Sequence, residues 1–253
     1  MSEGQVEELG SLRRLSEGEA RRLSPGSEHY TAFVGPPDQY DLMGATQFAL
    51  LVALGLRGQH RVLDFGCGSL RAGRLLIPYL DRGNYHGLEP NAWLIEEAIE
   101  RQIGRDQMAI KWPHFHANDD FRADRCGGDF DFILAQSIFS HAGADIVERA
   151  LDGFRRALAP SGLALATFIH PGQSGVNASG GAGWLYPDCV AHAPATIAAL
   201  IERTGLFGRA LPWFHPRQTW YVMARDPDRL PRPELDVHLR GAVLNVPEWQ
   251  ESL

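Results

Sequence analysis

Two acidic residues flank a pair of closely spaced glycines, and this arrangement is the part of the sequence best suited to chemistry. Asp64 comes two residues before Gly66, and Glu89 lies 21 residues beyond Gly68. The glycines let the chain turn sharply and let a ligand approach the backbone, and N–H groups at a following helix start attract anions. An acidic side chain at the end of the next strand can bind both hydroxyls of a ribose. The spacing therefore predicts a nucleoside site.

Arg71 and Asp64 narrow the choice of nucleoside. A dinucleotide fingerprint has a third glycine where this sequence has Arg71. A carboxylate at position 64 would repel a pyrophosphate, whereas it would attract an ammonium or sulfonium group. The pair favours a cationic amino-acid nucleoside over a nicotinamide dinucleotide.

The elements that position these residues alternate between strand-like and helix-like patterns. Asp41 is a plausible N-cap for a nearly all-apolar helix. We expect helices at 42–56, 70–80, 91–103, 146–158 and 194–205. Strands are expected at 61–65, 84–89, 112–117, 130–135, 162–170, 210–214 and 219–224. The order predicts an α/β fold, a three-layer sandwich with a mostly parallel seven-stranded sheet and an antiparallel last strand.

Composition and charge limit which domain organisation and which classes of partner the sequence allows. The 253 residues fit a short arm at 1–40, one domain at 41–225 and a Pro-rich extension at 226–253. With 24 basic and 31 acidic residues the net charge is −7, which disfavours nucleic acid. The three cysteines lie far apart, without metal-binding spacing. No apolar stretch is long enough to span a bilayer, and the N-terminus has no signal core, so we expect a cytoplasmic protein without a membrane partner.

Four motifs, in order, carry a family resemblance. Asp64-Phe-Gly-Cys-Gly68 resembles the first motif of the class I S-adenosylmethionine (SAM)-dependent methyltransferases, and Leu88-Glu-Pro-Asn91 resembles the second. Residues 130–137 resemble the motif that follows their fourth strand, and residues 158–162 the turn before their fifth. The resemblance covers about residues 42–225. It implies the Rossmann-like methyltransferase fold and SAM as the cofactor.

The resemblance also implies roles for single residues. The methionine part of the cofactor would be lined by Asp64, Gly66, Cys67, Gly68 and Ser69, and its ribose would be held by Glu89, next to Pro90. Asn118 or Asp119 would meet the adenine, and Gln136 and Ser137 the amino-acid end. Arg71 could pair with the cofactor carboxylate or could face solvent from a helix. Tyr30 and Tyr40 lie in a segment that would fold over the cofactor, although either could simply pack.

The reaction needs a nucleophile and, for a hydroxyl acceptor, a base. Histidine suits a base near pH 7. His141 and His170 follow the fourth and fifth strands, where ligands of open sheets bind, and His215 is a third candidate. Trp184 and Tyr186 could form a wall for a substrate or pin their own loop. The sequence after the fourth strand, Ala135-Gln-Ser-Ile, lacks the Asn/Asp-Pro-Pro-Tyr/Phe run of enzymes that methylate nucleobase amines.

The sequence thus predicts methyl transfer to a small-molecule acceptor, on oxygen or on nitrogen, with no metal site. Two alternatives keep the cofactor: a non-methylating reaction on SAM, and a non-catalytic SAM-binding module. A nicotinamide-dependent oxidoreductase is a further alternative. The oligomeric state stays open, with the arm and the tail as places where a second copy could dock to form a homodimer.

Overall fold

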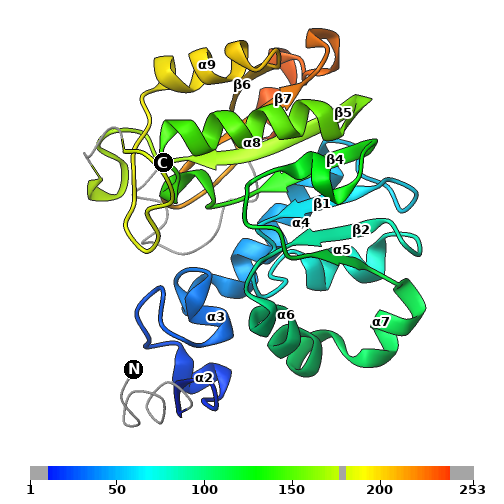
Figure 1. Ribbon diagram of the computed structural model, residues 1–253, viewed down its shortest axis with the longest axis vertical. Coiled ribbons are helices and arrows are strands. Elements are labelled where there is room, and N and C mark those ends of the chain that lie inside the picture. Colours follow the sequence, from blue (N-terminus) through cyan, green and yellow to red (C-terminus); the bar gives the residue numbers. More distant parts are fainter. Residues whose placement is uncertain (1–10, 177–180, 240–253) are drawn as a thin grey trace.

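A seven-stranded sheet forms the centre of the molecule. The computed structural model describes residues 11–176 and 181–239, and its strands follow the order β3-β2-β1-β4-β5-β7-β6 (Figure 1). Their bounds are β1 Val62–Phe65, β2 Tyr85–Leu88, β3 His114–His116, β4 Phe130–Ala135, β5 Leu158–Phe168, β6 Phe207–Leu211 and β7 Thr219–Ala224. β1 to β5 pair in parallel, and β7 runs antiparallel to both β5 and β6. The mixed sheet and its antiparallel last strand are therefore confirmed.

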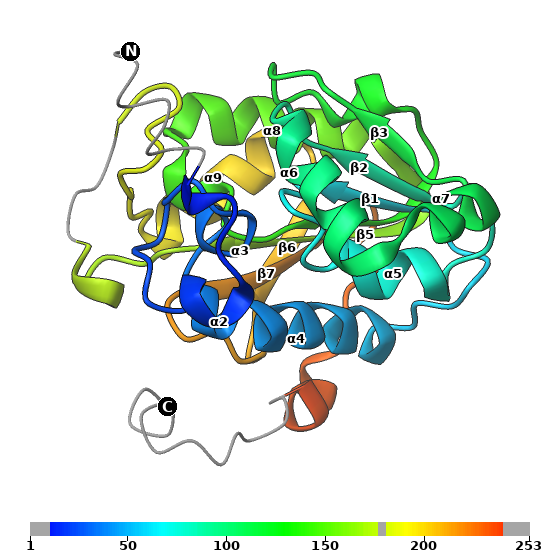
Figure 2. The same cartoon turned by 90° about the horizontal axis from the view of Figure 1, so that it is seen from below.

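Helices cover both faces of this sheet, and two cores result (Figure 2). Side chains alternate across the strands, so that Val62 and Leu165 face one core while Leu63 and Ala164 face the other. The first core lies under α4 Tyr40–Ala53, α5 Gly73–Tyr79, α6 Ala92–Ala98 and α7 Arg105–Lys111. The second lies under α8 Ala144–Ala157 and α9 Pro194–Arg203. This arrangement is a three-layer sandwich with one continuous sheet in the middle.

Some predicted boundaries of the helices are wrong. α5 begins at Gly73, after turns at residues 66–72, so Arg71 precedes the helix. Asp41 does not cap α4, because a 3₁₀ turn at Pro37–Gln39 runs directly into a helix that begins at Tyr40. α7 was not predicted, and it follows a π-helical turn at Ile99–Ile103 and Gly104.

Segments near both ends of the chain pack on the domain. Short helix α3 Tyr30–Phe33 packs on α6, and α2 Glu17–Ala20 packs on α3 (Figure 1). After β7 the chain forms 3₁₀ turns at Pro227–Arg229 and Pro233–Leu239 instead of an extended arm. Arg209 on β6 holds this tail through two hydrogen bonds to Asp236, of 2.7 and 2.9 Å. Residues 1–10 of the predicted arm and 240–253 of the predicted extension lie outside the described residues.

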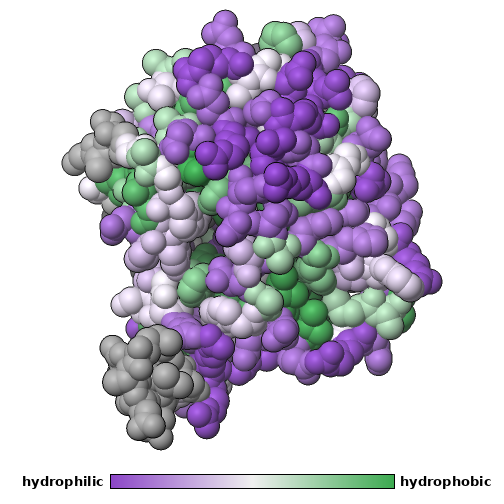
Figure 3. Space-filling view, in the orientation of Figure 1, coloured by the Kyte–Doolittle hydropathy of each residue, from purple (hydrophilic) through white to green (hydrophobic). Residues whose placement is uncertain are grey.

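One face of the molecule is mostly polar. Hydrophilic side chains cover most of the face seen in Figure 3. Within residues 11–176 and 181–239, no helix has the length and apolar character needed to cross a membrane.

Candidate active site

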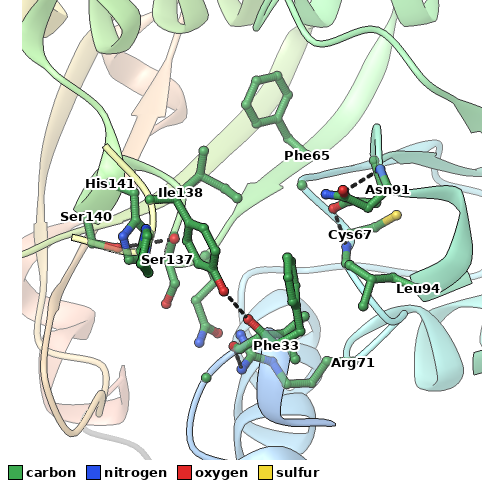
Figure 4. A pocket seen from close by; sticks show the side chains of 18 of the residues that line it. Phe33, Phe65, Cys67, Arg71, Asn91, Leu94, Ser137, Ile138, Ser140 and His141 are labelled. Atoms are coloured by element: carbon green, nitrogen blue, oxygen red, sulfur yellow. Dashed lines mark hydrogen bonds between the residues drawn. The ribbon is translucent and has the colours of Figure 1, made fainter. Parts of the chain in front are cut away.

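One large cavity lies where the parallel strands end. It has a volume of about 690 Å³, within the size range of small-molecule sites. Its walls come from the loops that follow β1, β2, β3 and β4, from residues 25–36 and from the loop at 184–189. Figure 4 shows Ser137, Ser140 and His141 on one side of the cavity and Cys67, Asn91 and Leu94 on the other. Parts of the chain far apart in sequence thus enclose a single site.

The glycine turn after β1 needs its glycines for space as well as for backbone conformation. Gly66 and Gly68 have φ angles of 73° and 52°. A Cβ atom at Gly66 would lie 2.1 Å from Cδ1 of Ile138, and one at Gly68 would lie 2.6 Å from Cγ1 of Val34. Leu70 also has a positive φ, 56°, although it is fully buried. Such a strained backbone is maintained by its surroundings and is typical of ligand sites.

Glu89 is buried and fixes the turn to the end of β2. Its Oε2 accepts a hydrogen bond of 3.1 Å from the Gly68 backbone N–H, and its Oε1 accepts bonds from the backbone and side chain of Asn91 (2.9 and 2.7 Å). Burial raises the pKa of this carboxyl even though these bonds favour its charged form. A carboxylate has about four acceptor positions, so Glu89 keeps capacity for a ligand hydroxyl.

Asp64 is a second buried carboxyl at this cavity. The Tyr85 hydroxyl donates to its Oδ2 at 2.8 Å. Burial raises the pKa of Asp64 to about 6, against the opposing effects of Tyr85 and Arg71. The cavity therefore presents two desolvated carboxyl groups, which a cationic ligand would favour in their charged form. The thiol of Cys67, also buried here, has a raised pKa because of burial and these carboxylates.

Arg71 lines the cavity and does not face solvent. Arg71 is only 8% exposed, and its NH1 donates to the Val34 carbonyl at 2.8 Å. Its Nε has no partner among the described residues. Burial lowers the pKa of Arg71 to about 10, which still leaves it charged at neutral pH. A buried guanidinium with an unused N–H is suited to an anion such as a carboxylate.

Most of the other predicted cofactor residues also line the cavity: Pro90, Asn118, Asp119, Gln136 and Ser137. The Asn118 amide donates to Asp120 at 2.8 Å, which holds the loop after β3. Ser137 has a φ of 60°, and its backbone N–H donates to the Thr167 hydroxyl at 2.8 Å. The loops after β3 and β4 therefore contribute residues to the wall of this cavity.

Two predicted cofactor residues do not reach the cavity. Ser69 and Tyr40 are buried, and neither is among the described residues that line it. The Tyr40 hydroxyl donates to the Ser69 carbonyl at 2.7 Å, so this pair braces the glycine turn from behind. Tyr30 packs edge-on against Tyr40 and donates to Glu17, and it too takes the packing role.

The three histidine candidates have different surroundings. His141 lines the cavity, and its Nδ1 lies 2.8 Å from the Asp188 carbonyl. Since a carbonyl only accepts, Nδ1 carries the proton and Nε2 of the neutral ring is left as an acceptor. Burial lowers the pKa of His141, so the neutral form prevails at pH 7. His170 is held by the Tyr221 hydroxyl at 3.0 Å, His215 is half-buried beside Gln136, and neither belongs to the lining that the structure describes. Of the three histidine candidates, His141 is the one that lines the described cavity.

An aromatic band flanks His141. Trp184 and Tyr186 stack with a 14° angle between their planes, and both rings lie edge-on to His141. Phe121 packs on Trp184, and Phe33 packs on Tyr186. The Tyr186 hydroxyl also donates to the Phe33 carbonyl at 2.9 Å, which ties the 184–189 loop to the N-terminal segment. These rings thus both line the cavity and pin the loop.

Sequence reasoning missed Gln47 and Gln218, which are buried and line the same cavity. Gln47 interrupts an otherwise nearly apolar helix, and that interruption was the available signal. Nothing in the sequence around Gln218 indicates a role.

The donor and acceptor set fits SAM. Glu89 can hold a ribose hydroxyl, Asp64 can face the positive charge, and the unused Nε of Arg71 can meet the carboxylate. A family model described as "Methyltransferase domain" matches residues 63–164. The match runs from β1 into β5 and includes Asp64, Glu89 and His141.

Solved structures share the fold over most of the chain. The magnesium protoporphyrin IX methyltransferase from Synechocystis PCC 6803, with bound SAM, matches at 14% identity and a TM-score of 0.57, over 89% of this chain and 99% of that one. DhpI in complex with SAH (S-adenosylhomocysteine) matches at 18% identity and 0.55, over 90% and 100%. A putative O-methyltransferase from Nostoc punctiforme PCC 73102 matches at 17% and 0.57, over 87% and 68%. Likeness at such low identity shows the fold.

Proposed function

We propose that the chain, a SAM-dependent methyltransferase with the class I fold, transfers the methyl group to the hydroxyl oxygen of a small aromatic acceptor. The observation that supports this most is the state of His141. Its Nδ1 is committed to the Asp188 carbonyl, so Nε2 is available as a base in the cavity wall. The net charge of −7 favours a small molecule over a nucleic acid as the partner.

The aromatic band supports a flat acceptor. Trp184 and Tyr186 present stacked rings beside His141, and aromatic faces bind other flat rings through offset or edge contacts. A phenolic hydroxyl has a pKa near 10, so it is neutral at pH 7 and must lose a proton as the new bond forms.

The chain's residues then have separable tasks. Bound SAM supplies an activated methyl group on a positively charged sulfur. Asp64 and Glu89 hold the nucleoside, the aromatic band orients the acceptor and excludes water, and Nε2 of His141 takes the hydroxyl proton. Residues 25–36 complete the enclosure from the N-terminal side.

The test is a product assay with SAM and a panel of phenols, in which SAH and methylated product are measured by mass spectrometry. We expect His141→Ala to lower kcat by about 10²- to 10⁴-fold, the usual contribution of a general base, while SAH affinity is unchanged. Wild-type kcat/KM should fall as the pH drops below the ordinary histidine pKa, because the His141 pKa is lowered, and the variant should lack this acid limb.

His170→Ala is the matched control, since that ring lies outside the described lining and should not affect the rate. An unchanged rate in His141→Ala would remove the base from the mechanism. Release of methylthioadenosine in place of SAH would contradict methyl transfer altogether.

A further inference from the structure

Four residues that line this cavity each have a buried polar atom without a hydrogen-bond partner among the described residues. These atoms are Oε1 of Gln47, Gln136 and Gln218 and Nε of Arg71. Each of these residues is at most 9% exposed. An unpaired buried polar group is costly, and native proteins contain few of them. Four at a single cavity indicate a ligand that supplies their partners.

These residues reach the cavity from four separate parts of the fold. Gln47 lies on α4, Arg71 in the glycine turn, Gln136 directly after β4 and Gln218 directly before β7. α4 is pressed against the turn, because a Cβ atom on Gly44 would lie 2.5 Å from the Arg71 carbonyl oxygen, and Gln47 is one helical turn beyond Gly44. The fold thus brings Gln47 and Arg71 to the same wall.

The amide nitrogens of two glutamines are already engaged. Nε2 of Gln218 donates to the Ser137 hydroxyl at 3.0 Å, and Nε2 of Gln136 lies 3.3 Å from Nε2 of His215. These contacts leave the amide oxygens as the unused ends. The subsite therefore offers three neutral acceptors together with one cationic N–H donor.

An α-amino-acid group matches this set. An ammonium has three N–H donors and no acceptor, and a carboxylate pairs with a guanidinium. A phosphate would leave the three amide oxygens without donors. We propose that Gln47 and Gln218, together with Gln136 and Arg71, form the subsite that binds the ammonium and carboxylate of the cofactor's amino-acid end.

Gln47 and Gln218 both lie outside residues 63–164, so the matched domain does not account for them. The proposal rests on SAM as the cofactor and is independent of His141 and of the acceptor. Failure of this proposal would leave the proposed reaction standing, and the reverse also holds.

The experiment compares two ligands that differ in the amino-acid end. SAH carries this end and 5′-methylthioadenosine lacks it, and both are titrated calorimetrically into wild type, Gln47→Leu and Gln218→Leu. A hydrogen bond to a charged group is worth about 10- to 100-fold in affinity. We expect each variant to lose about this factor for SAH and to bind methylthioadenosine as wild type does.

Gln107→Leu is the matched control. Its Oε1 on α7 is equally unpaired among the described atoms, but the residue is not part of the cavity lining that the structure describes. It should leave the affinity for both ligands unchanged. Equal losses for SAH and methylthioadenosine in Gln47→Leu and Gln218→Leu would overturn the proposal, and so would no loss for either ligand.

The wild-type protein provides the same test if a variant does not fold. Wild type should bind SAH at least about 100-fold more tightly than methylthioadenosine, since several charged hydrogen bonds are lost with the amino-acid end. Equal affinity for the two ligands would overturn the proposal without any mutation.

Discussion

Asp64→Asn should make the protein more stable at neutral pH while it weakens cofactor binding. The carboxyl is buried, and its pKa is raised to about 6 from an ordinary value of 3.8. The folded state therefore holds this proton more tightly than the unfolded state does, and stability falls as the pH rises from about 4 to 6. Above pH 6 the loss of stability caused by the buried charge levels off at about 3 kcal/mol, because the folded and unfolded pKa values differ by about 2.2 and each unit corresponds to 1.36 kcal/mol.

Asparagine keeps the acceptor for the Tyr85 hydroxyl and removes the charge. Its own effect on packing does not depend on pH, so the useful quantity is how the stability difference between variant and wild type changes with pH. At pH 4.5 the charge costs about 1 kcal/mol, and at pH 8 about 3 kcal/mol. The variant should therefore gain about 2 kcal/mol relative to wild type between these two pH values.

Urea denaturation followed by circular dichroism at pH 4.5 and pH 8 measures this gain. Asp119→Asn is the control, because Asp119 lines the same cavity from an exposed position and its replacement should change stability little. The reasoning is refuted if the difference between Asp64→Asn and wild type is the same at both pH values. Calorimetry with SAH should show weaker binding by Asp64→Asn at pH 8, since the ammonium group of the ligand loses its buried counter-charge.

Two further predictions concern the glycine turn and the sheet edge. Gly68→Ala should destabilise the protein more than Gly104→Ala does, and only Gly68→Ala should weaken SAH binding. Both glycines have a positive φ, but only at Gly68 would a Cβ atom meet a neighbour, the Val34 side chain at 2.6 Å. Equal stability loss and unchanged SAH affinity in both would contradict this. Burial and the neighbouring Arg61 lower the pKa of His86 to about 3. As the pH falls, the histidine of the unfolded chain takes up a proton first. The free energy of unfolding should therefore decrease by about 2 kcal/mol between pH 7 and pH 5. Urea denaturation should show a smaller acid loss in His86→Asn, and an equal loss would refute the assignment.

The alternation of strands and helices could be predicted because each element has its own hydrophobic pattern. The start of α5 could not be predicted, because tertiary contacts determine the conformation of residues 66–72. Glu89 holds the Gly68 N–H, and Leu70 takes a left-handed conformation that its residue type disfavours. Likewise Asp41 resembles an N-cap, yet the preceding 3₁₀ turn leads into an α4 that begins two residues earlier than predicted, at Tyr40.

The sequence predicted the site residues that lie at the ends of strands, and it missed those that reach the cavity from elsewhere in the fold. Asp64 and Glu89 each belong to a sequence motif, and the structure places both at the cavity. His170 follows β5 at the expected edge, but its ring bonds to Tyr221 on the antiparallel neighbour β7, a pairing that strand patterns do not specify. Gln47 reaches the cavity from a helix before the first strand, and only the packed structure brings it there.

A crystal structure of the SAH complex tests the central claim most directly, because that claim concerns which groups of the chain face which groups of the cofactor. We expect a ribose hydroxyl at the Glu89 carboxylate, the ligand ammonium toward Asp64 and the amide oxygens, and the ligand carboxylate at Nε of Arg71. A ligand bound outside this cavity, or one that makes no contact with either carboxylate, would contradict the account.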